Sequence, residues 1–150
     1  MDLSQTSALC SRGIDGLLGE DFFFHRILQI DFRDLCIRLL DKADAARCCA
    51  VMPLKTDHSA FCVQVSVNGS EPRWTRLDTG CDDGLHWVTG SAGQARTSLA
   101  LGGETIRNVR TELHRSPLFP QEAGLLGNGV LSGYRVTIDG VNHRLLLARV

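Results

Sequence analysis

The chain has 150 residues, of which 43% are hydrophobic and 22% are charged, and its formal net charge is −1. This is the composition of a globular protein with an ordinary core. Its lysines and arginines form no basic stripe and no apolar run approaches the roughly 18 residues of a membrane span, so we expect no nucleic-acid partner and no membrane span.

The first ordered pattern along the chain is an apolar-glycine turn, Gly16-Leu17-Leu18-Gly19. A short helix is expected to follow over 20–27, and then a strand pair that turns at 31–34. Residues 1–4 show neither the basic region nor the long apolar region of a secretion signal. We therefore expect no signal peptide in this stretch, and the compartment stays unknown.

The same pattern returns 108 residues later as Gly124-Leu125-Leu126-Gly127. At this offset Leu39 aligns with Leu147, and no gap is needed between the two copies. A second short helix is expected over 129–133, followed by a strand pair that turns at 139–142. The constant offset predicts that one structural unit is used twice.

The chain has six cysteines, at Cys10, Cys36, Cys48, Cys49, Cys62 and Cys81. They form no C-x-x-C pair, and no histidine lies near them at a usual ligand spacing, so the spacing predicts no metal site. The even count permits disulfides, but the adjacent Cys48-Cys49 pair and the lack of a small secreted scaffold disfavour them. We expect mostly buried thiols and no cofactor.

The middle of the chain reads as a β-hairpin that ends in a distinctive turn. Residues 61–67 alternate apolar and polar side chains, Asn68-Gly69 is a strong hairpin signal, and 73–77 returns as the partner strand. This strand leads directly into Asp78-Thr79-Gly80. Beyond it, short strands with frequent glycine turns and little helix predict a mainly β closed barrel or sandwich.

These elements resemble the retropepsin-like aspartyl protease family. The resemblance rests on Val67-Asn68-Gly69, on Leu77-Asp78-Thr79-Gly80, on Leu99 to Gly103 with Ile106 to Val109, and on both Gly-Leu-Leu-Gly segments. It implies the acid-protease closed barrel with one short helix per lobe. In this family two lobes meet, and each contributes one Asp-Thr-Gly loop to a shared cleft. The second lobe comes from a homodimer partner or from a fused repeat.

The resemblance also implies a division of the chain. Residues 1–45 resemble the C-terminal part of a first lobe, 46–56 a linker, and 57–150 a lobe that carries the Asp-Thr-Gly motif. The first copy lacks the strands and the motif that precede the glycine signature in the second copy. We therefore expect a tandem two-lobed form whose first lobe is truncated here, with the missing part in an upstream segment, or else a homodimer.

The implied function is an aspartic-type endopeptidase that acts on a peptide or protein substrate. Two carboxylates about 3 Å apart share one proton, so one activates a water and the other donates toward the oxyanion. Asp78 is the predicted catalytic carboxylate. The resemblance gives Thr79 a hydrogen bond across the lobe interface and gives Gly80 the role of permitting the loop.

Three features favour an alternative, a catalytically inactive retropepsin-like module that binds peptides or acts as a scaffold. The chain contains a single Asp-Thr-Gly. The family has small residues followed by Ser or Thr after this motif, whereas Cys81-Asp82-Asp83 adds two carboxylates. The connection from Thr89 to Ser98 is also short for a flap that closes over substrate.

Overall fold

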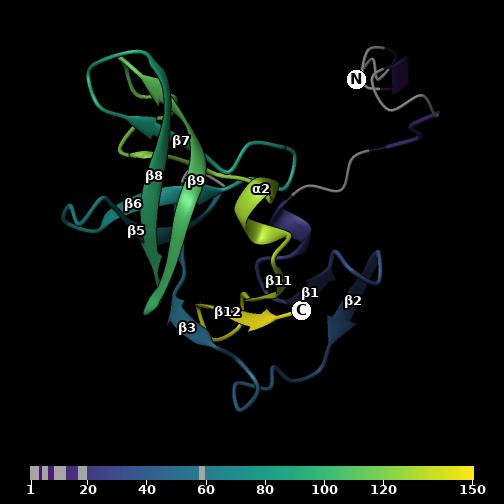
Figure 1. Cartoon of the computed structure of the whole chain (residues 1–150). Coiled ribbons are helices and arrows are strands. Elements are labelled where there is room, and N and C mark those ends of the chain that lie inside the picture. Colours follow the sequence, from purple (N-terminus) through teal and green to yellow (C-terminus); the bar gives the residue numbers. More distant parts are fainter. Residues whose placement is uncertain (1–3, 5–6, 9–12, 17–19, 58–59) are drawn as a thin grey trace.

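A computed structural model describes residues 4, 7–8, 13–16, 20–57 and 60–150. Within these ranges the chain is mainly β, and its strands form two sheets with a short α-helix, α2 (Asn128–Leu131), beside them (Figure 1). No helix in the described ranges is long and apolar enough to cross a membrane.

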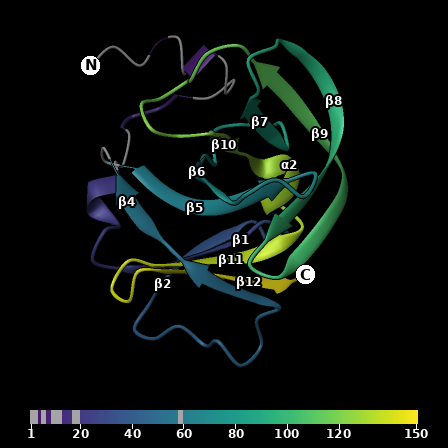
Figure 2. The same ribbon diagram turned by 90° about the vertical axis from the view of Figure 1, so that its left-hand side faces the viewer.

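The larger sheet closes into a barrel. Its strands follow in the order β4-β5-β6-β10-β7-β9-β8, and an added pairing between β5 and β8 joins the six strands from β5 to β8 into a ring (Figure 2). The strands are β4 (Lys55–Asp57), β5 (Ala60–Val67), β6 (Arg73–Leu77), β7 (Leu85–Val88), β8 (Gly93–Leu101), β9 (Glu104–His114) and β10 (Gly124–Leu126). The predicted mainly β closed barrel is confirmed.

The hairpin between β5 and β6 turns where the sequence predicts. Asn68 and Gly69 have φ angles of 52° and 78°, so both lie in the left-handed region that a two-residue hairpin turn requires. The amide of Ser70 donates to the carbonyl of Val67 at 3.0 Å and closes the turn. This turn brings β6 back along β5 and fixes where β6 ends.

The smaller sheet combines strands from both ends of the described chain. Its order is β2-β1-β11-β12-β3, and all neighbours are antiparallel. The strands are β1 (Ile27–Asp31), β2 (Cys36–Leu40), β3 (Ala50–Pro53), β11 (Tyr134–Asp139) and β12 (Arg144–Arg149). Segments that are far apart in sequence thus form one continuous layer beneath the barrel (Figure 1).

The register of this sheet relates its two hairpins. Gln29 of β1 lies opposite Thr137 of β11, and its Nε2 donates to Thr137 Oγ1 at 3.2 Å across a separation of 108 residues. Leu28 faces Leu39 in the β1–β2 hairpin, and the residues 108 positions later, Val136 and Leu147, face each other in the β11–β12 hairpin. The two hairpins therefore have the same internal register at this offset.

Each hairpin contains a buried aspartate in its turn. Asp31 Oδ1 accepts a 3.0 Å hydrogen bond from the amide of Asp34, and Asp139 Oδ1 accepts one of the same length from the amide of Asn142. The hydrogen bond from the Asp34 amide is the main cause that lowers the pKa of Asp31. Burial alone would raise the pKa of Asp139, but hydrogen bonds from Asn142 and Arg144 outweigh it, and the net shift is downward.

The first predicted helix is wrong in its length. Only a 3₁₀ turn, η1 (Glu20–Phe22), forms in the predicted range 20–27, and Ile27 already begins β1. Ile27 is instead buried in the sheet, where it pairs with Leu40 and Asp139. Sheet pairing thus overrides local helix preference here. The second predicted helix, over 129–133, begins and ends slightly earlier, as α2.

The segment 46–56, predicted as a linker, carries β3 and the start of β4. Ala50 and Met52 are buried in the main core, and β3 pairs with β12. This segment therefore runs from the smaller sheet into the barrel as an integral part of both. The proposed domain boundaries stay a prediction.

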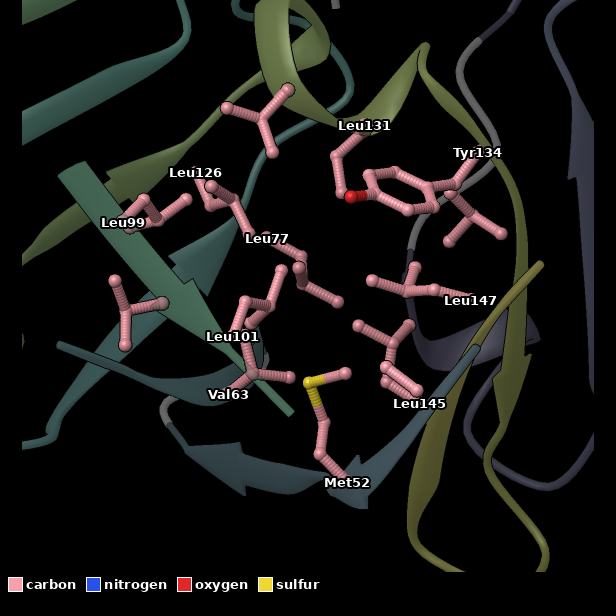
Figure 3. Packing of buried hydrophobic residues seen from close by; sticks show 14 of the residues in the cluster. Met52, Val63, Leu77, Leu99, Leu101, Leu126, Leu131, Tyr134, Leu145 and Leu147 are labelled. Carbon is pink, nitrogen blue, oxygen red and sulfur yellow. The ribbon is translucent and has the colours of Figure 1, made fainter. Parts of the chain in front are cut away.

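The main core lies between the barrel and the smaller sheet. Figure 3 shows Met52, Leu145 and Leu147 of the smaller sheet pointing toward barrel residues such as Val63 and Leu101. All five are buried. The barrel is thereby anchored on the sheet, and this fixes the ends of β6 and β10 relative to β1 and β11.

Candidate active site

The Asp-Thr-Gly motif forms the turn that leaves β6. The amide of Asp78 donates to the carbonyl of Leu126 at 3.0 Å, and Asp78 Oδ1 accepts a 2.9 Å hydrogen bond from the amide of Gly80. The amide of Cys81 then donates to the carbonyl of Asp78 at 3.3 Å. Asp78 is half-buried, whereas Thr79 and Gly80 are exposed. The backbone therefore holds the carboxylate at the surface of the loop.

Strand β10 packs against this loop and holds it in place. β10 lies between β6 and β7, parallel to β6 and antiparallel to β7. A Cβ added at Gly124 would lie 1.8 Å from the carbonyl oxygen of His86, and one at Gly127 would lie 2.3 Å from that of Asp83. Both glycines of the signature Gly-Leu-Leu-Gly are thus explained by close backbone contact with the strand and loop that follow Asp78.

Asn128 clamps the loop at the start of α2. Its Nδ2 donates to the carbonyl of Thr79 at 2.7 Å, and its amide donates to the carbonyl of Cys81 at 2.7 Å. Its Oδ1 is buried and has no hydrogen-bond partner among the described residues. The sequence did not predict this role of Asn128, because its partner Thr79 lies 49 residues earlier in the chain.

A pocket of about 180 Å³ opens beside Asp78. Its lining comes from both layers of the fold and consists of Phe23, Leu28, Ile30, Phe61, Leu77, Asp78, Thr79 and Ile138. The pocket is apolar apart from the carboxylate and hydroxyl at one end. It is smaller than the roughly 300 to 1,000 Å³ of ordinary ligand sites, so it accommodates one or two side chains rather than a whole ligand.

The fold is similar to that of a solved aspartic proteinase from Irpex lacteus. The TM-score is 0.55 at 13% identity, and the match covers 83% of this chain and 56% of that one. The chain has the aspartic-protease fold. It spans only 56% of the length of the Irpex lacteus proteinase.

A retropepsin-like aspartic protease from Rickettsia conorii also matches, with a TM-score of 0.48 and 17% identity over 65% of this chain and 86% of that chain. No family model matches the chain, and no curated protein matches it significantly.

Within the aspartic-protease fold, Asp78, Thr79 and Gly80 lie together in one loop, as the motif predicts. The hydrogen bond described for the Asp78 carboxylate runs to the loop amide of Gly80, and none among the described residues joins it to another carboxylate. The loop between β7 and β8 comprises only Thr89 to Ala92, whereas the predicted connection ran from Thr89 to Ser98. The described part of this chain therefore presents one candidate catalytic carboxylate.

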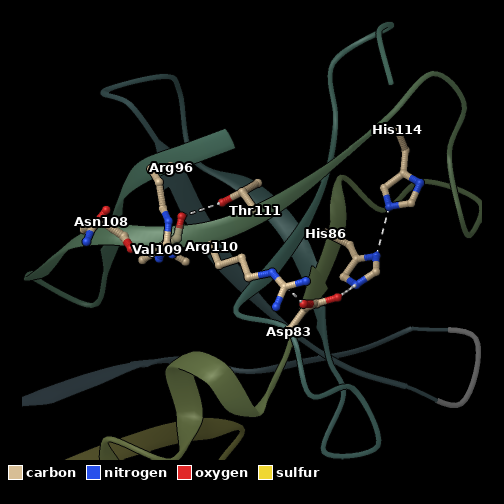
Figure 4. Close-up of polar contacts among 8 residues, drawn as sticks. All are labelled: Asp83, His86, Arg96, Asn108, Val109, Arg110, Thr111 and His114. Carbon is tan, nitrogen blue, oxygen red and sulfur yellow. Dashed lines mark hydrogen bonds and ion pairs between the residues drawn. The ribbon is translucent and has the colours of Figure 1, made fainter. Parts of the chain in front are cut away.

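A second polar cluster lies on the far end of the same loop (Figure 4). Asp83 Oδ2 lies 3.2 Å from His86 Nε2, and Asp83 Oδ1 lies 3.3 Å from Nε of Arg110. His86 Nδ1 lies 2.9 Å from Nε2 of His114, and the two rings are stacked at an angle of 15°. The sequence did not predict this cluster, because its residues come from three separate elements.

Cys81 lies beside this cluster. Burial is the main cause that raises the pKa of its thiol, and the carboxylates of Asp78, Asp83 and Asp82 raise it further, while a hydrogen bond from the Asp83 amide opposes them. These surroundings favour the neutral thiol over the reactive thiolate.

Proposed function

We propose that the chain is part of an aspartic-type endopeptidase in which Asp78 supplies one carboxylate and a second lobe supplies the other. The observation that carries this proposal is the position of Asp78. It sits half-buried at the mouth of an apolar pocket, on a loop that β10 and Asn128 hold in place. An exposed surface aspartate would not need such support.

The chemistry follows from the pairing of two such loops. At about 3 Å the two carboxylates cannot both ionise cheaply, so they hold one proton between them. The ionised partner takes a proton from a water as that water attacks the peptide carbonyl, and the protonated partner donates to the carbonyl oxygen. The proton then returns through the pair to the departing amine, with no covalent intermediate.

The smaller sheet supports a fused second lobe. If the two hairpins are copies of one unit, the pairing of Gln29 with Thr137 lies on the approximate twofold axis that relates them. The edge of β11 that a homodimer partner would need for the same pairing is already occupied by β1 of this chain. A tandem protein thus fits better than a homodimer.

The exposed side chains of β2 also support a fused second lobe. Ile37 is 68% and Leu39 is 51% exposed, whereas Leu145 and Leu147, which lie 108 positions later in β12, are completely buried under the barrel. β2 is also the edge strand, while β12 continues to β3. We infer that a barrel of the first lobe covers Ile37 and Leu39, and that a strand equivalent to β3 pairs with β2.

The test uses the longest natural form of the protein, whose intact mass is measured first. Asp78→Asn is expected to lower kcat for a fluorogenic peptide by about a hundredfold or more, with little change in KM, because the dyad loses its general base. The matched control is Asp82→Asn, an exposed carboxylate in the same loop. Equal loss in both variants, or full activity in Asp78→Asn, would contradict the assignment.

The short loop from Thr89 to Ala92 favours a second candidate, an inactive module that binds an extended peptide. The next hairpin, β8–β9, turns at Gly102 against Met52, and none of its residues lines the pocket beside Asp78. Such a module would bind the peptide as an added strand without hydrolysing it. Binding that survives Asp78→Asn, together with no turnover by the unmodified protein, would support this candidate.

A further inference from the structure

Three side chains of different chemistry converge where the loop after Asp78 enters β7. They are the thiol of Cys81, the carboxylate of Asp83 and the imidazole of His86, and their ligand atoms all lie within 4.8 Å of one another. Each residue is half-buried. The site is therefore shielded from bulk water but open enough for an ion to enter.

The donor set selects the kind of ion. Thiolate and imidazole together favour zinc, whereas magnesium and calcium prefer oxygen ligands. Zinc bonds of about 2.0 to 2.3 Å at tetrahedral angles place neighbouring ligand atoms about 3.4 Å apart. Asp83 Oδ2 and His86 Nε2 are already 3.2 Å apart. The Cys81 sulfur lies within 4.8 Å of both atoms, and it must move closer to complete a three-ligand arrangement.

The surrounding residues orient two of these ligands. When His86 Nε2 binds an ion, its Nδ1 carries the proton and donates to Nε2 of His114, which lies 2.9 Å away. Arg110 contacts Oδ1 of Asp83 and leaves Oδ2 facing His86. A histidine and a carboxylate that are held through their second polar atoms are the usual support of a metal site.

The charge of the loop also favours a cation. Asp78, Asp82 and Asp83 all lie close enough to the Cys81 thiol to act on it electrostatically. Arg110 pairs with Asp83, but its side chain is 63% exposed, so water and salt screen its positive charge. A divalent ion would relieve the repulsion among these carboxylates.

We propose that Cys81, Asp83 and His86 bind one zinc ion, with the fourth position open to water. The thiol proton of Cys81 passes to solvent when its sulfur binds the ion. The proposal does not depend on the proposed peptidase chemistry, although Cys81 directly follows the Asp-Thr-Gly motif. It departs from the expectation drawn from cysteine spacing, because the ligands follow one another at the unusual positions i, i+2 and i+5 rather than in a C-x-x-C pair.

The experiment measures metal binding by the full chain under a phosphine reductant that keeps the cysteines as thiols. Zinc affinity is determined by competition with a chromogenic chelator, and cobalt is added as a spectroscopic probe of sulfur ligation. We expect one equivalent of zinc to bind. Cys81→Ser is expected to abolish the sulfur-to-cobalt charge-transfer band and, like His86→Gln, to weaken zinc binding by about a hundredfold or more, while His114→Phe weakens it by about tenfold.

Cys49→Ser and His143→Gln are the matched controls, since both side chains are exposed on other parts of the molecule, and neither is expected to change the affinity. Circular dichroism without metal checks that each variant is folded. If Cys81→Ser does not fold, Asp83→Asn replaces it as the second ligand variant. The proposal is overturned if no zinc binds, or if folded variants at positions 81 and 86 keep the original affinity.

Discussion

Leu39 and Leu147 occupy matching positions of the two hairpins in opposite surroundings, and the difference can be expressed as a stability change. Leu147 is 0% exposed and Leu39 is 51% exposed. Leu147→Ala removes three buried carbon atoms worth about 0.8 kcal/mol each and leaves a cavity, so we expect the free energy of unfolding to fall by about 3 to 4 kcal/mol. In Leu39→Ala the removed carbon atoms are only about half buried and water fills the space they leave. The expected loss in the free energy of unfolding is therefore about 1 kcal/mol.

The assay is urea unfolding of this chain, followed by the fluorescence of Trp74 and Trp87 and extrapolated linearly to water. Equal losses for the two variants would refute the contrast in burial on which the argument depends. The same pair is then compared in the longest natural form. If a first lobe covers β2, the loss for Leu39→Ala rises to about that for Leu147→Ala. A loss that stays near 1 kcal/mol there would refute the fused lobe.

Two further predictions concern backbone packing and pH. Gly124→Ala is expected to destabilise this chain by about 3 kcal/mol, because its Cβ would overlap the carbonyl of His86. The control Gly16→Ala is expected to be neutral, since a Cβ there meets nothing within 4 Å. Thermal unfolding compares the two variants, and equal shifts of the melting temperature would contradict the steric explanation. The pKa of Asp139 is lower in the folded chain than the ordinary value of 3.8. The ionised carboxylate therefore stabilises the fold at pH values above 3.8, and this contribution disappears as the pH falls through the folded pKa. Asp139→Asn should therefore reduce stability near neutral pH and flatten its decline below about pH 4, which urea titrations at several pH values would detect; an unchanged decline would count against it.

Features that depend only on residues adjacent in sequence were predictable from the sequence. Asn68-Gly69 marks its hairpin because few other residue pairs adopt two successive left-handed conformations. The Asp78 loop was also placed correctly at the end of a strand. The helix predicted over 20–27 failed because the outcome there depends on Ile27 pairing with residues far away in sequence, and local preference carries no information about such pairing.

The support of the candidate site was out of reach for the same reason. Nothing near Asp78 in sequence shows that β10 lies between β6 and β7, or that Asn128 bonds to Thr79. The cluster around Asp83 likewise combines a loop, β7 and β9, and includes Arg110 from the last of these. These contacts arise from the barrel topology, and a single sequence reveals them only after the fold is known.

The insertion of β10 also bears on how the protein is made. Leu126 pairs with Leu77 on one side and with Leu85 on the other, both of which are synthesised well before it. Contacts over such separations form late, because a long stretch of chain must be closed first. A nascent chain on the ribosome has no carbonyl of Leu126 to hold the amide of Asp78. We expect the Asp78 loop to take its final shape only after residues 124–128 have emerged, so this loop is among the last parts of the fold to become ordered.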